Sequence, residues 1–182
     1  MGVQLPGPAD RALRLFRVDF APAHRQPPAV SVVAAAVVSV AGSLAADALL
    51  VVIGQAVFPS VRGYVHFQFA DYSKLTVTGV LIACAAWPVV TRISSSPRWL
   101  FLRMAAAVTL VLWLPDIYIL AGGQPARAVA VLFVMHLAIA VVTYTALVHI
   151  AKVKPLRSAQ HAGPARRGPG RTVSTARSGP ST

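Results

Sequence analysis

The sequence predicts an all-α membrane protein in which four transmembrane helices form an antiparallel bundle. Three observations lead to this fold class. The composition is 56% hydrophobic and only 12% charged, with a mean hydropathy of +0.65, which is too apolar for a soluble domain. Four apolar stretches approach or exceed the roughly 20 residues that a helix needs to cross the hydrocarbon core. The basic residues, finally, divide very unequally between the two sides that four crossings would define.

The apolar stretches divide the chain into three parts. The transmembrane domain covers residues 29–151. Its predicted spans are residues 29–58, 75–91, 99–121 and 128–150, of which the second is the shortest. Residues 1–28 form a basic tail, in which "ADRALRLFRVDF" predicts either a short helix on the membrane surface or a polar coil. Residues 152–182 form a second basic tail, rich in Pro, Gly, Ser and Thr and without acidic residues, which predicts disorder.

The basic residues predict the orientation of the chain. Fourteen Lys and Arg residues belong to the two tails and to the connection between the second and third spans with the start of the third span, whereas only Arg62, Lys74 and Arg127 belong to the other side. Because cytoplasmic segments carry the excess of Lys and Arg, both termini are expected in the cytoplasm. The partners expected for the tails are the anionic lipids of the inner leaflet, with each basic residue contributing about 1 kcal/mol. No nucleic-acid partner is expected, because aromatic residues are not interleaved with the tail arginines.

The aromatic residues lie mainly near the ends of the spans. The exported loop, residues 59–74, contains Tyr64, Phe67, Phe69 and Tyr72. Aromatic side chains in such a position usually lie at the level of the lipid headgroups, and we favour this interpretation. The alternating pattern of "VHFQF" leaves a short strand or a cap over the bundle as the alternative. Trp87 and Trp99 are expected in the aromatic belt on the cytoplasmic side.

The first span contains one charged residue, Asp47, and a ridge of small residues leads to it. At four-residue intervals before Asp47 stand Ser43, Ser39, Ala35 and Ser31. Ridges of small residues let two helices approach closely in lipid. An ionised carboxylate facing hydrocarbon would cost at least about 2.5 kcal/mol. We therefore expect this ridge to pack on another helix, with Asp47 facing the interior of the bundle.

Two further polar residues lie within the apolar spans, at a depth similar to that of Asp47. At 1.5 Å of rise per residue, Asp47, Asp116 and His136 all fall in the outer half of the membrane, with Thr76 and Thr78 nearby in depth. In one interpretation the three residues line a pocket for a proton, a cation or a small cationic solute, since intramembrane acids often serve as relays. In the other they are interhelical clamps that contribute roughly 0.6–2 kcal/mol each. The clamp is favoured, because no second motif indicates transport.

Nothing in the sequence indicates an enzyme. The chain contains no Glu, no His-x-x-x-His pair and no phosphate-binding glycine loop, so no catalytic residues and no cofactor are predicted. Cys84 is the only cysteine and is interpreted as a small packing residue. Two Asp and one His could in principle bind a metal, but their spacing is not diagnostic, and no metal site is predicted.

Three stretches carry a resemblance to known proteins. "KLTVTGVLIACAAW", "VTLVLWLPDIYIL" and "VMHLAIAVVTYTAL" together resemble a family of small four-helix bacterial integral membrane proteins of unassigned function. The resemblance covers about residues 30–151 and excludes both tails. It implies the same four spans, and it supplies no catalytic or binding residues.

These observations together lead to one expected function and one alternative. We expect a multi-pass plasma-membrane protein with both termini in the cytoplasm, acting as a non-enzymatic membrane component. The alternative is a proton-linked or cation-linked carrier of small solutes that uses Asp47 and His136. Four helices make a thin carrier, so the alternative would need a homodimer; whether the chain forms a homo-oligomer is left open.

The charge distribution generates a prediction about topology. A reporter fused after Ile150 should report the cytoplasm, and a reporter inserted within residues 60–72 should report the exported side, because basic segments are retained inside. A pair of reporters whose activity depends on the compartment measures this. The same compartment for both positions would contradict the four-span prediction.

Overall fold

The structure is a computed structural model that describes residues 7, 13, 18 and 24–155. Most of the tail at residues 1–28, and the tail at residues 152–182 from residue 156 onward, lie outside the described residues. The predictions of a surface helix and of disorder therefore concern segments for which the structure gives no description.

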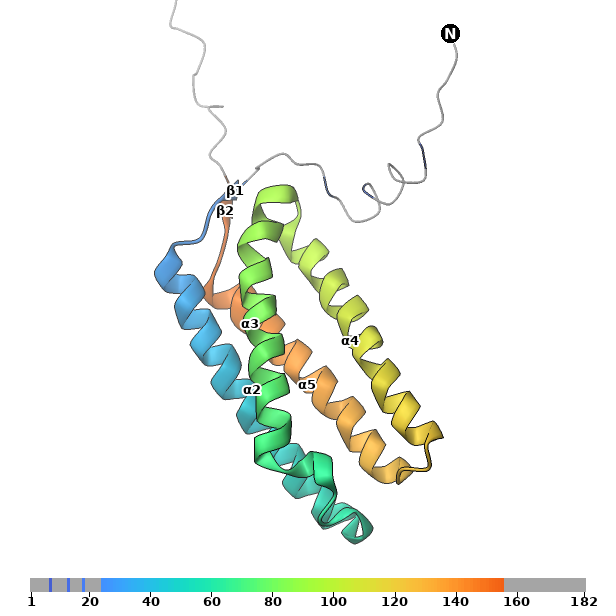
Figure 1. Ribbon diagram of the computed structural model, residues 1–182. Coiled ribbons are helices and arrows are strands. Elements are labelled where there is room, and N and C mark those ends of the chain that lie inside the picture. The colour runs from blue at the N-terminus through green and yellow to red at the C-terminus, as the bar shows by residue number, and fades with distance from the viewer. Residues whose placement is uncertain (1–6, 8–12, 14–17, 19–23, 156–182) are drawn as a thin grey trace, which may run out of the picture.

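The predicted fold class is confirmed, because four long apolar helices pack together as an all-α membrane bundle (Figure 1). The helices are α2 (Ala29–Val57), α3 (Phe69–Ile93), α4 (Pro97–Ala121) and α5 (Ala126–Ile150), and each is long and apolar enough to cross a membrane. The largest difference from the predicted spans is that α3 begins at Phe69 instead of residue 75. Asp71 lies in the first turn of α3, where an acidic side chain is favourable, and Tyr72 is buried.

The arrangement of the helices gives the bundle two chemically distinct ends (Figure 1). At one end, which we call the tail end, strand β1 (His24–Arg25) pairs antiparallel with strand β2 (Lys154–Pro155), so the segments next to both tails lie together. The connection between α3 and α4 lies at this end too. The other end, which we call the cap end, carries the short 3-10 helices η1 (Pro59–Val61) and η2 (Val65–Phe67) and the turn between α4 and α5.

The ridge of small residues on α2 packs inside the bundle. Ala35, Ser39, Ser43 and Asp47 are each 0% exposed, and Ser31 at the start of the ridge is half-buried. Two glycines on α2 lie directly against α5. A Cβ atom on Gly42 would lie 3.0 Å from Cγ1 of Val142, and one on Gly54 would lie 2.9 Å from Cγ2 of Val131. The two helices can approach this closely because those positions carry no side chain.

The tail end has its own apolar core, centred on Trp87. This residue is 0% exposed, its ring meets Phe101 edge-on at 5.1 Å, and its Nε1 donates a hydrogen bond to the carbonyl oxygen of Ala151 at 3.0 Å. The expectation that Trp87 lies in the aromatic belt was therefore wrong: its indole N–H has a partner inside the protein, which lets the whole ring be buried. Trp99 is 42% exposed.

The loop at the cap end is a cap over the bundle. Val61, Phe67 and Tyr72 are buried in a second apolar cluster that includes Val131 and Met135. The favoured headgroup-level interpretation is therefore wrong for Phe67 and Tyr72. The second 3-10 turn places Phe67 in the cluster with residues of α2 and α5, and Tyr72, in the first turn of α3, is buried in the same cluster. Phe69, by contrast, is 62% exposed.

The close contact between α2 and α5 generates a prediction about stability. Gly54→Ala should lower the free energy of unfolding by about 1–3 kcal/mol, because the new methyl group overlaps the stiff side chain of Val131. Unfolding in mixed detergent micelles measures this. Gly79→Ala is the matched control, since a Cβ there meets nothing within 4 Å, and it should change stability by less than about 0.5 kcal/mol. Equal stability of the two variants would contradict the packing described.

Candidate functional site

Asp47 is bound to the neighbouring helix α3. The Oγ1 atom of Thr76 donates a hydrogen bond to Oδ2 of Asp47 at 2.7 Å, and both residues are buried. The other carboxylate oxygen, Oδ1, is buried and has no hydrogen-bond partner among the described residues. Thr78, which has a similar depth in the sequence, is exposed. Asp47 thus faces the interior of the bundle, as predicted, and its hydrogen-bond partner there is a threonine hydroxyl.

Asp116 and His136 lie together between α4 and α5. Nδ1 of His136 is 3.1 Å from Oδ2 of Asp116 and 3.0 Å from the carbonyl oxygen of Leu132, one turn earlier on α5. A carbonyl oxygen can only accept, so this geometry requires that Nδ1 carries a hydrogen. That hydrogen is shared between two acceptors, and Oδ2 of Asp116 makes no well-directed hydrogen bond of its own within the described chain. Oδ2 of Asp116 therefore has room to accept a further hydrogen bond.

The three residues predicted to cluster belong to two separate pairs, Asp47 with Thr76 and Asp116 with His136. No hydrogen bond joins Asp47 to either of the others among the described residues, although Asp47 lies within electrostatic range of His136. One pair attaches α3 to α2, and the other attaches α4 to α5. The polar residues of the cap half thus attach α3 to α2 and α4 to α5, and α2 and α5 pack closely on one another.

The cap contributes polar groups that sequence reasoning missed. His66 and Asp71 form an exposed pair with 2.8 Å between Nδ1 and Oδ2. Tyr64 packs edge-on against His66, with 5.3 Å between ring centroids. Burial and, secondarily, the negative charge of Asp116 raise the pKa of Tyr64, so this ring lies within electrostatic range of the carboxylate. The sequence did not predict the pair of His66 and Asp71. The two residues lie on either side of the start of α3, and the predicted span began several residues later, at residue 75.

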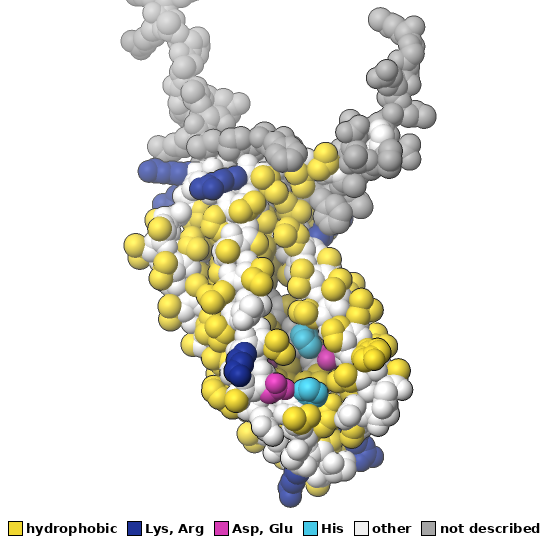
Figure 2. Space-filling view, viewed as in Figure 1, with side chains coloured by type: hydrophobic (Ala, Val, Ile, Leu, Met, Phe, Trp, Pro, Cys, Tyr) yellow, Lys and Arg dark blue, Asp and Glu magenta, His cyan; other side chains and the backbone are white. Residues whose placement is uncertain are grey.

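The pair of Asp116 and His136 is close to the surface. The side chain of His136 is 25% exposed and that of Asp116 is 7% exposed. Figure 2 shows histidine and acidic side chains gathered in a hollow of an otherwise hydrophobic face, over the cap half of the bundle between α3 and α4. Asp47, in contrast, is 0% exposed. Solvent or a headgroup can therefore reach the imidazole, whereas the described structure gives no such access to Asp47.

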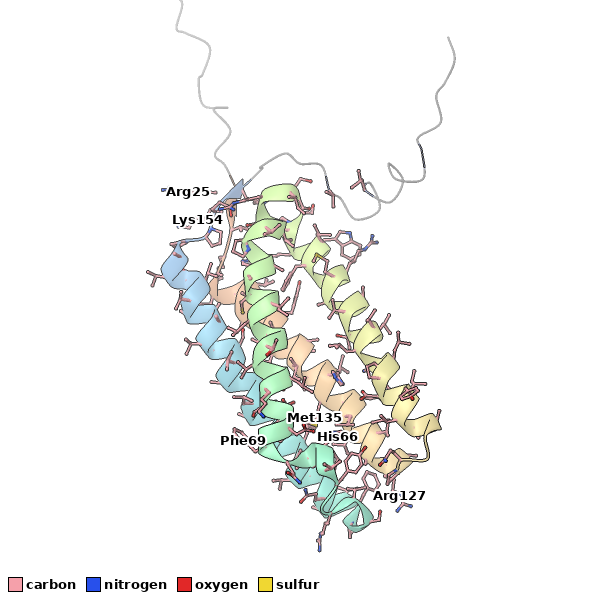
Figure 3. The ribbon with its side chains drawn as sticks, viewed as in Figure 1. Arg25, His66, Phe69, Arg127, Met135 and Lys154 are labelled. Carbon is pink, nitrogen blue, oxygen red and sulfur yellow. The ribbon has the colours of Figure 1, made fainter. Side chains whose placement is uncertain are left out.

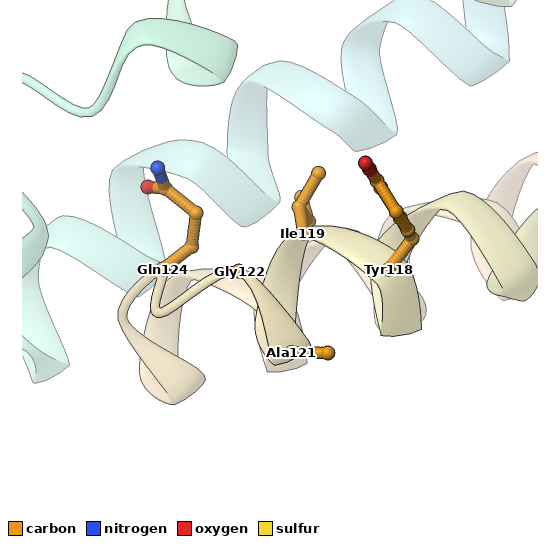
Figure 4. Close-up of a pocket in the computed structure, with 5 residues that line it drawn as sticks. All are labelled: Tyr118, Ile119, Ala121, Gly122 and Gln124. Carbon is orange, nitrogen blue, oxygen red and sulfur yellow. The ribbon is translucent and has the colours of Figure 1, made fainter.

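Two of the shallow depressions on the described surface are lined by residues other than Asp47, Asp116 and His136. One, of about 390 Å³, lies at the turn between α4 and α5 and is lined by Tyr118, Ile119, Ala121, Gly122 and Gln124 (Figure 4). The other, of about 370 Å³, lies at the tail end. Among residues 24–155, no three His, Cys, Asp or Glu side chains are grouped closely enough to hold a metal ion.

Comparison of the chain with protein-family models, curated proteins and solved structures found no match. Of the resemblance to small bacterial four-helix proteins, the four-helix membrane architecture is supported by the four long apolar helices.

The bond between Thr76 and Asp47 generates a prediction. Thr76→Val keeps the shape of the side chain but leaves Asp47 without a hydrogen-bond donor, so the free energy of unfolding should fall by about 1–3 kcal/mol. Thr78→Val makes the same chemical change at an exposed position and should cost less than about 0.5 kcal/mol. Unfolding of both variants in mixed micelles measures the difference. Two equally stable variants would show that the hydrogen bond contributes nothing.

Proposed function

We propose that this chain is a multi-pass plasma-membrane protein with both termini in the cytoplasm, and that it acts as a non-enzymatic membrane component. Four apolar helices support the membrane placement, and the excess of Lys and Arg at the tail end supports the orientation. The two basic tails would bind anionic lipids of the inner leaflet, in keeping with their composition.

One observation supports a structural, non-catalytic role for Asp47 and Asp116. Each acid is paired with a residue of a neighbouring helix, Asp47 with Thr76 and Asp116 with His136. Polar contacts between membrane helices contribute roughly 0.6–2 kcal/mol each. Two such clamps, one for α3 and one for α4, would hold both outer helices in place.

A second candidate function is a proton-linked or cation-linked carrier of small solutes that uses Asp47 and His136. It is favoured by the unpaired, buried Oδ1 of Asp47 and by the partial exposure of the His136 side chain. In this function a proton or cation would bind between the two side chains, which lie within electrostatic range of one another. A carrier of this size would act as a homodimer.

Proteoliposomes that contain a pH-sensitive dye distinguish the two functions. If Asp47 is only a clamp, imposed gradients of Na⁺, K⁺ or a cationic dye should move no protons beyond the level of empty liposomes. Asp47→Asn should then change the free energy of unfolding by less than about 1 kcal/mol, because the amide keeps the size and the hydrogen-bonding capacity of the side chain.

A proton flux in the wild type that Asp47→Asn abolishes would overturn the structural role and establish the carrier. Asp71→Asn is the matched control, because this carboxylate is exposed in the first turn of α3, outside the bundle interior, and its loss should leave any such flux unchanged. A flux that survives Asp47→Asn would contradict both candidate functions as stated.

A further inference from the structure

The second depression lies at the tail end, between segments that are far apart in the sequence. One wall consists of His24 and Val153, from the segments on either side of the transmembrane domain. The opposite wall consists of Ser95, Ser96, Arg98 and Trp99, from the connection between α3 and α4 and the start of α4. Its volume of about 370 Å³ could accept a phosphate group with part of a glycerol backbone.

Pairing between distant segments holds the first wall in place. His24 belongs to β1, which is held by antiparallel pairing with β2, and Val153 directly precedes β2. The bond from Trp87 to the carbonyl oxygen of Ala151 fixes the chain just before Val153, and Thr91 donates a hydrogen bond to Oε1 of Gln26 at 2.8 Å. Both contacts attach this wall to α3, so the depression is part of the folded bundle.

The tail end is strongly basic. The exposed basic residues at this end are Arg25, Arg92, Arg98, Lys152 and Lys154. Figure 3 shows Arg25 and Lys154 near one another at this end, and Arg127 at the opposite end. All three acidic residues among the described positions, Asp47, Asp71 and Asp116, lie in the cap half. An anion in the depression would therefore meet an excess of positive charge with no described carboxylate beside it.

The polar groups of the walls suit a phosphate. The guanidinium of Arg98 presents paired N–H donors that match phosphate oxygens. The half-buried imidazole of His24 lines the depression, and its Nδ1 has no hydrogen-bond partner among the described residues. Hydroxyl groups of two serines complete the polar lining.

The position of the depression indicates a lipid as the source of the phosphate. Trp99 lines the depression and is 42% exposed, and the guanidinium of Arg103 lies 4.3 Å from the centroid of its ring. Trp and Arg together at the start of a span are typical of the membrane interface. Below them, α4 presents exposed apolar side chains such as Leu102 and Val108, along which acyl chains could lie. A free anion would use only the polar part of this surface.

We propose that the depression between His24 and Arg98 binds the phosphate headgroup of an anionic membrane lipid, in a defined site at the tail end. The proposal rests on the membrane placement in the proposed function, but not on the orientation or on the role of Asp47. It differs from attraction of the basic tails to the membrane surface, because it assigns recognition to particular side chains of the folded bundle.

Spin-labelled lipids test the proposal. The full chain is reconstituted in phosphatidylcholine bilayers that contain trace spin-labelled phosphatidic acid or spin-labelled phosphatidylcholine, at a salt concentration that screens diffuse attraction. Electron paramagnetic resonance measures the immobilised fraction of each lipid. We expect a preference for phosphatidic acid in the wild type, which Arg98→Gln lowers at least about tenfold, because the amide loses the charge-assisted hydrogen bonds to the phosphate.

Arg92→Gln is the matched control, because it removes an exposed positive charge at the same end from a residue that does not line the depression. This variant should keep the preference. His24→Ala, which changes the other side of the depression, should weaken the preference for phosphatidic acid. An equal loss in Arg92→Gln and Arg98→Gln, or no preference in the wild type, would overturn the site. Release of the spin-labelled lipid by excess inorganic phosphate would show that free phosphate is the ligand. Proton flux plays no part in this measurement, so its outcome is independent of the carrier test.

Discussion

The close packing of α2 on α5 is the contact on which the rest of the bundle depends. Lipid chains are as apolar as the helices, so burial of apolar surface does not drive association, and close approach must hold the helices together. The ridge of Ala35, Ser39 and Ser43 and the glycines at positions 42 and 54 permit that approach. α3 and α4 then pack on the pair that α2 and α5 form.

The polar residues of the cap half attach the outer helices to this inner pair. The ridge on α2 leads directly to Asp47, whose carboxylate is buried by the same packing and therefore needs a donor from another helix. Thr76 supplies the donor from α3, which sets the rotation of that helix about its own axis. On the other side, Asp116 and His136 relate α4 to α5 in a similar way. The packing also leaves Oδ1 of Asp47 without a hydrogen-bond partner among the described residues, and a ligand in the interior would have to use this atom.

The two ends of the bundle differ in their chemistry because different elements close them. At the cap end, two 3-10 turns fold Val61 and Phe67 onto the helices and bring Tyr64 within electrostatic range of Asp116. At the tail end, the pairing of β1 with β2 draws the flanking segments together beside the start of α4 and leaves basic side chains exposed. The three described acidic residues thus lie in the cap half, together with Arg62, Lys74 and Arg127, whereas the larger group of exposed basic residues lies at the tail end, in agreement with the proposed transmembrane orientation.

The sequence by itself determined the fold class, the number of helices and the inward face of α2. These properties follow from local features: the length of each apolar stretch, and the repeat of small residues at four-residue intervals that places them on one row of a helix. The depth of Asp47, Asp116 and His136 could be estimated in the same way, because rise per residue is constant. Only the tertiary structure decided that Asp116 pairs with His136 while Asp47 pairs with Thr76. Depth fixes one coordinate of a side chain, whereas pairing also depends on which helices are neighbours and how each is rotated. The burial of Trp87 and the folding of the cap were likewise beyond the sequence, because each depends on a partner far away in the chain: the carbonyl of Ala151 for Trp87, and the apolar surface of α5 for Phe67.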